Sequence, residues 1–350
     1  MEITTALQGT GDSYNHIISS SFAILCNHVR PLFADKEKLM KVLFTSCRPL
    51  HRAENIEAVW NAWEGDKIFG QMAGNLVCDE LFRSDTDLIV TDEYVAFSPV
   101  PVVMIFHGAA GGKSYGLDME RPYVNEDTMK YLSYVITTSK DMIPMTAKQC
   151  RISEDRVLPY GMPRTDAYFK EWPRLSDKRV YLFAPTFRND YEPRFPDIDW
   201  SLIDSLLTDD EALLVKPHMV QERLVKEEYK HIAHIPSILP STPFLMGSDV
   251  LVTDYSSILF DAHIAGKPVV LFEKDVKYRM FRKMYMPYPD GYAGRYATNE
   301  KELVEAMRSA TFQTEKDLEC KEKNCSACDG HSTERVIKLM EDILNGKTDD

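Results

Sequence analysis

Four short motifs hold the residues that could do chemistry, and each directly follows an apolar run of strand-like length. They are His107-Gly108 with Lys113 downstream, Thr186-Phe187-Arg188, Lys216-Pro217-His218, and Asp254-Tyr255-Ser256-Ser257. A histidine titrates near physiological pH, so it can accept a proton from an attacking hydroxyl. Arginine and lysine match the oxygens of phosphate groups. Because ligands bind at the carboxyl ends of strands in open α/β sheets, this placement predicts a phosphate site.

The segment from Ser248 to Phe272 is the most informative of the four. It indicates a strand over residues 250–252, a polar turn, a helix that starts near Ser256 and Ser257, and a second strand over residues 268–272. Free backbone N–H groups and the positive end of the helix dipole converge at such a helix start, which favours phosphate binding. The alternative is that Asp254 or Ser256 only caps the helix.

The residues of the other motifs could also have purely structural roles. His107 could be a loop histidine in a flexible glycine-rich turn, and His218 could be structural. Arg188 could form a surface ion pair with Asp190. In the turn Gly161–Asp166, the sequence predicts hinge structure with Arg164 and Asp166 paired locally.

Apolar runs alternate with helical patterns along the chain, which predicts parallel, doubly wound sheets. The strands are expected over residues 41–45, 88–90, 102–106 and 134–138 in the first half, and over 180–185, 213–216, 250–252 and 269–272 in the second. The rhythm restarts after a charged linker over residues 170–179, so we expect two Rossmann-like α/β domains with a ligand cleft between them. The expected boundaries are 1–170 for an N-terminal acceptor domain, 171–330 for a C-terminal donor domain, and 331–350 for a final helix and tail. Helical spacing of apolar residues over 14–33 also predicts an amphipathic helix, which packs on the body or lies on a bilayer.

The bulk composition narrows the function classes. The chain has 350 residues and a formal net charge of −13, which disfavours nucleic acid as a partner. It has no apolar run of transmembrane length, and residues 1–20 lack the pattern of a signal peptide, so we expect a cytoplasmic protein. Cys320, Cys325, Cys328 and His331 could hold zinc, but they lack the longer insert that usually separates two ligand pairs, and the sequence leaves this open.

Taken together, the motifs resemble those of the CDP-glycerol glycerophosphotransferases of teichoic-acid and capsule synthesis, which adopt the two-domain GT-B fold. The matching pieces are IFHG, YGMPRTDAYF, LFAPTFRND, LLVKPH, SDVLVTDYSSILFDAHIAGKPVVLF and DGHSTERVIKLM, in the family's order over most of residues 88–345.

The resemblance implies roles for four of the candidate residues, and the positions of the others after strands suggest theirs. It implies that His107 is the catalytic base and that His218, a second catalytic residue, lies with Ser256 and Ser257 at the CDP diphosphate. Further donor-binding residues would be Thr186, Arg188 and Lys216, with Asp254 or Asp261 near the ribose or as orienting groups. Gly108 and Lys113 would bind the acceptor.

The implied reaction transfers glycerol phosphate from CDP-glycerol to a polyol-phosphate or lipid-linked glycan acceptor and releases CMP, without a metal ion or other cofactor. A CDP-ribitol donor, a UDP-sugar transferase or epimerase, and a non-catalytic scaffold at the inner membrane surface are the alternatives. The family usually continues the HG motif with Thr-Pro, whereas this chain has Ala109-Ala110, so the acceptor stays open. The chain also lacks the long N-terminal extension of polymerising members, which favours a primase-like or capsule-type enzyme.

Overall fold

The structure is a computed structural model that describes residues 40–71, 85–93, 95, 98–106, 108, 130–188, 194–218, 221, 224–281, 284–312 and 314–347. The described residues from Lys41 onward belong to one compact unit. The helix predicted over 14–33 lies outside the described residues, as do His107, Lys113 and Asp190. Within the described part of the chain, no helix is long and apolar enough to cross a membrane.

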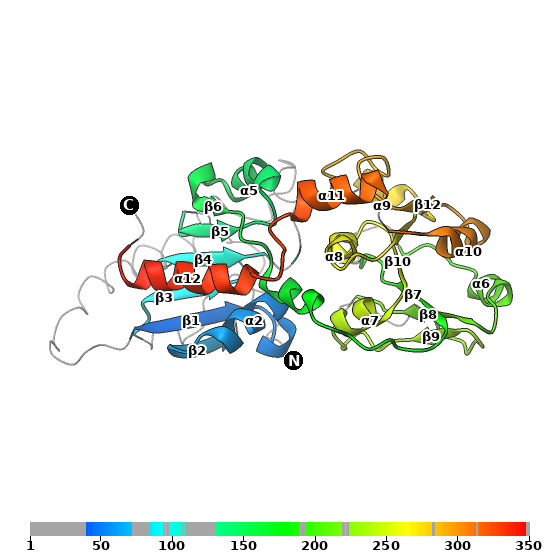
Figure 1. Cartoon of the computed structure of the whole chain (residues 1–350), viewed down its shortest axis with the longest axis horizontal. Helices are drawn as coiled ribbons and strands as arrows, with labels where there is room; N and C mark the ends of the chain where they lie inside the picture. Colours follow the sequence, from blue (N-terminus) through cyan, green and yellow to red (C-terminus); the bar gives the residue numbers. More distant parts are fainter. Residues whose placement is uncertain are drawn as a thin grey trace, which may run out of the picture. The chain divides into compact units, whose positions relative to one another are not determined.

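The first sheet consists of six parallel strands in the order β2-β1-β3-β4-β5-β6 (Figure 1). Their bounds are β1 Lys41–Ser46, β2 Asp66–Gln71, β3 Leu88–Thr91, β4 Val102–Ile105, β5 Tyr134–Ile136 and β6 Val157–Leu158. The strands predicted near residues 41, 88, 102 and 134 are confirmed. The sequence missed β2, an edge strand that is exposed at both ends and carries Gly70, so it lacks a continuous apolar run.

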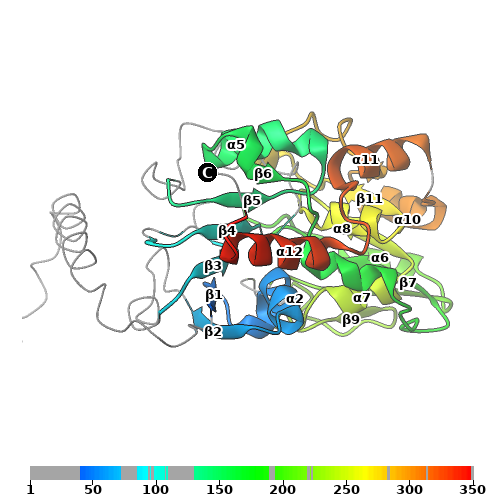
Figure 2. The same ribbon diagram turned by 60° about the vertical axis from the view of Figure 1, so that its left-hand side comes forward.

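Alternate residues of these strands face two separate cores, as the period of a strand requires. Val42 and Phe44 pack with one cluster, whereas Leu43, between them, packs with the other. The first cluster includes α2 (Glu54–Ala62) and α12 (Ser332–Leu344), and the second includes Cys150 of α5 (Ile143–Cys150). Figures 1 and 2 both show α12 along this sheet, so the last helix of the chain returns to cover the first sheet.

The second sheet is also parallel, with the order β12-β11-β10-β7-β8-β9. Its strands are β7 Arg179–Phe183, β8 Glu211–Val215, β9 Ile232–His234, β10 Val250–Thr253, β11 Val269–Phe272 and β12 Arg295–Ala297. The helices that accompany it are α6 Trp200–Leu206, α7 Thr242–Gly247, α8 Ile258–Ile264, α9 Lys277–Phe281, α10 Glu300–Ser309 and α11 Glu315–Cys325. The four predicted strands are confirmed, and the three-residue edge strands β9 and β12 were missed because so short a run carries little periodicity.

Four short 3₁₀ segments complete the described elements: η1 Leu50–Arg52, η2 Lys140–Met142, η3 Glu154–Arg156 and η4 Pro163–Phe169. The loop after β5 is tied to the end of α11 by hydrogen bonds. Thr138 Oγ1 donates to the carbonyl of Asn324 at 2.5 Å, and the N–H of Ala327 donates to the carbonyl of Thr138 at 3.0 Å. These bonds join an element of the first sheet to a helix of the second.

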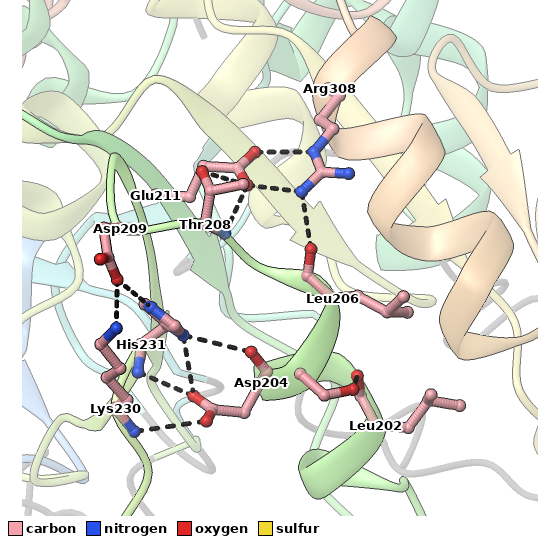
Figure 3. A network of polar contacts seen from close by, with 10 residues as sticks. Leu202, Asp204, Leu206, Thr208, Asp209, Glu211, Lys230, His231 and Arg308 are labelled. Atoms are coloured by element: carbon pink, nitrogen blue, oxygen red, sulfur yellow. Dashed lines mark hydrogen bonds and ion pairs between the residues drawn. The ribbon is translucent and has the colours of Figure 1, made fainter.

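A polar cluster holds the amino end of β8 (Figure 3). Glu211 begins this strand, and its carboxylate accepts hydrogen bonds from Arg308 Nε at 2.9 Å, from Arg308 Nη2 at 2.6 Å and from the N–H of Thr208 at 3.0 Å. Beside it, Asp204 Oδ1 accepts a 2.7 Å hydrogen bond from the N–H of His231. The cluster anchors α6 and α10 to the sheet at the end of β8 opposite to Lys216.

Candidate functional site at the carboxyl ends of the strands

Asp254 joins the two turns that follow β7 and β10. Its Oδ1 accepts hydrogen bonds from the N–H of Thr186 at 2.7 Å and from the N–H of Tyr255 at 2.6 Å, and its Oδ2 accepts from Arg188 Nη2 at 2.9 Å. The N-cap residue of α8 is Ser257, which makes no side-chain capping hydrogen bond, and other donors take both oxygens of Asp254, so Asp254 does not merely cap the helix. The carboxylate instead holds the Thr186 and Arg188 turn against the turn that leads into α8.

Arg188 is buried, with 6% of its side chain exposed. Its Nη1 donates to the carbonyl of Thr186 at 2.7 Å, and its guanidinium lies 3.8 Å from the ring centre of Tyr278. The arginine is therefore held by a carboxylate, a carbonyl and an aromatic face. Its Nε is buried and has no hydrogen-bond partner among the described residues.

A pocket opens beside this arginine at the ends of β7, β10 and β11. Its lining includes Arg188, Asp254, Tyr255, Glu273 and Lys274. Glu273 accepts a 2.5 Å hydrogen bond from the hydroxyl of Tyr255 and another from the hydroxyl of Tyr296. The sequence reasoning missed Glu273, although it directly follows a strand in the same way as the other motifs.

The motif after β8 lies against the motif after β7. The rings of His218 and Phe187 are 4.7 Å apart between their centres and tilted by 33°. Lys216 is buried, and its Nζ donates to the carbonyls of Pro217 at 3.3 Å and Ser237 at 3.2 Å. Burial lowers the pKa of Lys216, since desolvation penalises its ammonium form. The histidine thus reaches the site region, while the ammonium of the lysine is directed at backbone carbonyls.

Gly108 brings the first sheet to the start of α8. A Cβ atom on Gly108 would lie only 2.9 Å from Ser257 Oγ. Ser257 is the residue before the first turn of α8, and Ser256 precedes it in the chain. The turn after β4 and the turn after β10 therefore meet at Gly108 and Ser257. His107, which immediately precedes Gly108, lies outside the described residues, and so does Lys113.

The predicted local pairing of Arg164 with Asp166 is wrong. Arg164 pairs with Asp261 of α8, with Nη1 to Oδ1 at 2.8 Å and Nη2 to Oδ2 at 3.0 Å. Asp166 instead accepts hydrogen bonds from the N–H groups of Ser332 at 3.0 Å and Thr333 at 2.7 Å, at the start of α12. A carboxylate there satisfies helix N–H groups and complements the helix dipole, which explains the different partner.

Asp261 is 2% exposed, and its Oδ1 also accepts a 2.9 Å hydrogen bond from the hydroxyl of Tyr168. Both of its oxygens are thus engaged by η4. The orienting role expected for Asp261 stays a prediction.

The cysteines proposed for zinc lie in a hydrophobic core. Cys320, Cys325 and Cys328 are buried there, whereas His331 is exposed beside Glu334. Cys320 Sγ lies 3.6 Å from Nδ1 of the buried His263. Among the residues that the structure describes, no group of three or more His, Cys, Asp or Glu side chains could hold a metal ion.

Two parallel α/β sheets with polar turns at their carboxyl ends define a GT-B-like fold. The sequence model of the family described as CDP-Glycerol:Poly(glycerophosphate) glycerophosphotransferase matches residues 84–342, and the chain belongs to this family. The wall teichoic acid polymerase TagF has the same fold, with a TM-score of 0.70 and 18% identity over 98% of this chain and 100% of that one. A UDP-GlcNAc 2-epimerase from Neisseria meningitidis has a TM-score of 0.51 at 13% identity over 86% of this chain and all of that one.

Curated relatives carry teichoic-acid names. The teichoic acid ribitol-phosphate polymerase TarK of Staphylococcus aureus is 26% identical over 72% of this chain and 56% of its own length. The teichoic acid glycerol-phosphate primase of Bacillus subtilis is 25% identical over 75% of each chain. The chain therefore spans about half the length of the ribitol-phosphate polymerases that it matches.

Proposed function

We propose that this protein transfers glycerol phosphate from CDP-glycerol to a hydroxyl of a teichoic-acid-like or capsular polymer, or of its lipid-linked primer, and releases CMP. The observation that carries the proposal is the contact between Gly108 and Ser257 in a chain of this family. The contact supports the proposal because Gly108, the residue after His107, lies next to the helix start proposed for the donor diphosphate. Residues 1–170 would supply the acceptor side and residues 171–330 the donor side.

On the donor side, Ser256, Ser257 and His218 would hold the diphosphate through hydroxyl, backbone N–H and imidazole donors. Arg188 would support them through its positive charge, because Asp254 ties it to the Thr186 turn beside them. Donors that are already fixed lose little reorganisation energy when charge develops, and each typically lowers a barrier by about 2.7–4 kcal/mol.

In the reaction, the oxygen of the acceptor hydroxyl attacks the phosphorus that bears the glycerol. A new P–O bond forms, the P–O bond to the bridging oxygen of CMP breaks, and His107 takes the proton of the hydroxyl. CMP leaves with additional negative charge, which the groups around Ser257 and His218 would stabilise. We propose that the reaction needs no metal ion.

The test is a donor screen that follows nucleotide release from CDP-glycerol, CDP-ribitol and UDP-sugars, with and without a glycerol-phosphate-primed lipid. CMP release that depends on the primed lipid and survives EDTA would support the proposal. Release of UDP alone would refute it and favour a UDP-sugar enzyme. Loss of activity in EDTA would refute the metal-independent step.

CDP-ribitol is the second candidate donor, because relatives named as ribitol-phosphate polymerases match 72% and 68% of the chain. Faster CMP release from CDP-ribitol than from CDP-glycerol would select it. A scaffold role at the membrane depends on the helix predicted over 14–33. Liposome co-sedimentation without transfer from either CDP-alditol would favour that role.

A further inference from the structure

A continuous set of hydrogen bonds links the end of β4 to the helix that follows the serine turn. It begins at Asn55, in the first turn of α2, which is 3% exposed. Asn55 Nδ2 donates to the carbonyl of Phe106 at 2.7 Å, and Asn55 Oδ1 accepts from the N–H of Arg164 at 3.0 Å. One amide therefore contacts both the strand end that leads to Gly108 and the segment that connects the two sheets.

Arg164 carries the link onward to α8. Its guanidinium holds both oxygens of Asp261, as described above, and its Nη1 lies 3.6 Å from Glu54 Oε2. The side chains of Arg164 and Asp261 are 12% and 3% exposed. A charged pair shielded from water in this way is costly to disturb, so α8 is held firmly against η4.

The hydrogen bond from Asn55 to the Phe106 carbonyl constrains the position of Gly108, two residues later. The C=O of one residue and the N–H of the next share a rigid plane, so a hydrogen bond to the carbonyl of Phe106 limits the directions that the chain can take after β4. Gly108, two residues further on, lies against Ser257. The orientation of this peptide plane therefore constrains where Gly108 lies relative to the start of α8.

We propose that Asn55 is a positioning residue that sets the turn after β4 against the start of α8, through Phe106 on one side and through Arg164 and Asp261 on the other. The proposal rests on the function proposed above, in which this turn bears the general base. Asn55 would not touch either substrate. It would keep Gly108, on the acceptor side, correctly placed against Ser257, on the donor side.

The variant Asn55→Asp tests the two hydrogen bonds of the Asn55 amide separately. An ionised carboxylate accepts from the N–H of Arg164 but cannot donate to the carbonyl of Phe106, whereas a protonated carboxyl can do both. The charged groups near the position include Glu54 on its own helix, Arg164 on η4, Asp261 on α8 and Lys216 after β8, which interacts with Glu54. Burial and the facing carbonyl favour the protonated form of the new carboxyl, so donation returns as pH falls.

At pH 8, we expect Asn55→Asp to lower kcat by about 100-fold, since a displacement near 1 Å at reacting groups costs that much. The KM for CDP-glycerol should stay within about threefold, because the donor groups after β10 are untouched. The ratio of variant to wild-type kcat should rise as pH falls from 8 to 6. Asn55→Ser has no titratable group, so it should lose kcat without that recovery; it also serves if Asn55→Asp does not fold.

Asn324→Asp is the matched control. Asn324 is 1% exposed, and its Nδ2 donates to the carbonyl of Cys320 at 2.9 Å, away from the end of β4. The same exchange there should lower the melting temperature without a pH-dependent ratio of kcat values. The proposal would be overturned if kcat of Asn55→Asp were unchanged, or if its ratio to the wild-type kcat did not vary with pH. A ratio that varies with pH in the control would also overturn it.

The amide resonances of Gly108 and Ser257 give a readout that does not depend on turnover. In ¹⁵N-labelled protein, we expect Asn55→Asp, but not Asn324→Asp, to shift the Gly108 resonance. If wild-type protein releases no CMP from either CDP-alditol, the proposed function fails before any variant is measured. The resonances still test the link, and an unmoved Gly108 signal would overturn it.

Discussion

Replacing Gly108 by alanine tests whether the turn after β4 meets the start of α8. The added Cβ would lie 2.9 Å from Ser257 Oγ, closer than such atoms approach without a shift of one of them. Rotation of the Ser257 side chain can relieve the overlap, but it moves the hydroxyl proposed to hold the donor, and forcing extra volume into a packed contact typically costs about 1–3 kcal/mol. If that cost falls on the arrangement that reacts, Gly108→Ala should lower kcat/KM for CMP release by about 5- to 150-fold.

Ser257 provides an internal check of this cause. Without its Oγ, the nearest atom of residue 257 to the new Cβ would be its own Cβ at 3.7 Å, an ordinary van der Waals distance. The Gly108→Ala/Ser257→Ala double variant should therefore be no slower than Ser257→Ala alone. Effects that simply add in the double variant would refute the steric reasoning.

The assay is CMP release under saturating acceptor, together with thermal melting of each variant. Gly346→Ala is a suitable control. It introduces a Cβ that meets nothing within 4 Å, at a backbone φ of +64° that disfavours alanine. It should lower stability slightly and leave kcat/KM unchanged. Wild-type kcat/KM in Gly108→Ala, with its fold intact, would contradict the contact.

Three further predictions concern single side chains. His107→Ala and His218→Ala should each lower turnover by roughly two or more orders of magnitude while the melting temperature stays near that of the wild type, since each removes one group from the transfer step; near-normal turnover in both would remove them from the site. Asp254→Asn should raise the KM for CDP-glycerol, because the amide oxygen can still accept from Thr186 and Tyr255 but the amide nitrogen cannot accept from Arg188; an unchanged KM would show that this link is dispensable. Hydrogen bonds from Arg308 hold the pKa of Glu211 at about 2, below its ordinary 4.5. Its stabilising contribution is therefore complete above pH 4.5 and is lost as pH falls toward 2. Denaturant titrations of Glu211→Gln between pH 5 and pH 2 should show a shallower loss of unfolding free energy than the wild type, and parallel curves would contradict this.

Many features of the fold can be read locally. Runs such as Val250–Thr253 and Val102–Ile105 are buried on both faces, so a continuous apolar stretch marks them as strands of a parallel sheet. The edge strands β2, β9 and β12 are short or partly exposed, so the same criterion misses them. The polar motifs could be placed at strand ends because they follow these runs directly in the chain.

Local sequence patterns do not predict which side chains pair with each other. Arg164 has Asp166 two residues away, yet it pairs with Asp261, 97 residues distant, because the start of α12 takes the nearer carboxylate. Asp254 meets Thr186, 68 residues earlier, because β10 and β7 are neighbours in the sheet although β8 and β9 separate them in sequence. Neither partner leaves a trace in local periodicity.

The sequence by itself determined the two α/β halves and the turns where polar residues gather, because apolar runs and the residues after them are local features. Only the tertiary structure decided which turns meet. The contact of Gly108 with Ser257, and the path from Asn55 through Arg164 to Asp261, depend on strand order and on long crossings of the chain. Those are set by how both sheets bury their faces together, which no single segment encodes.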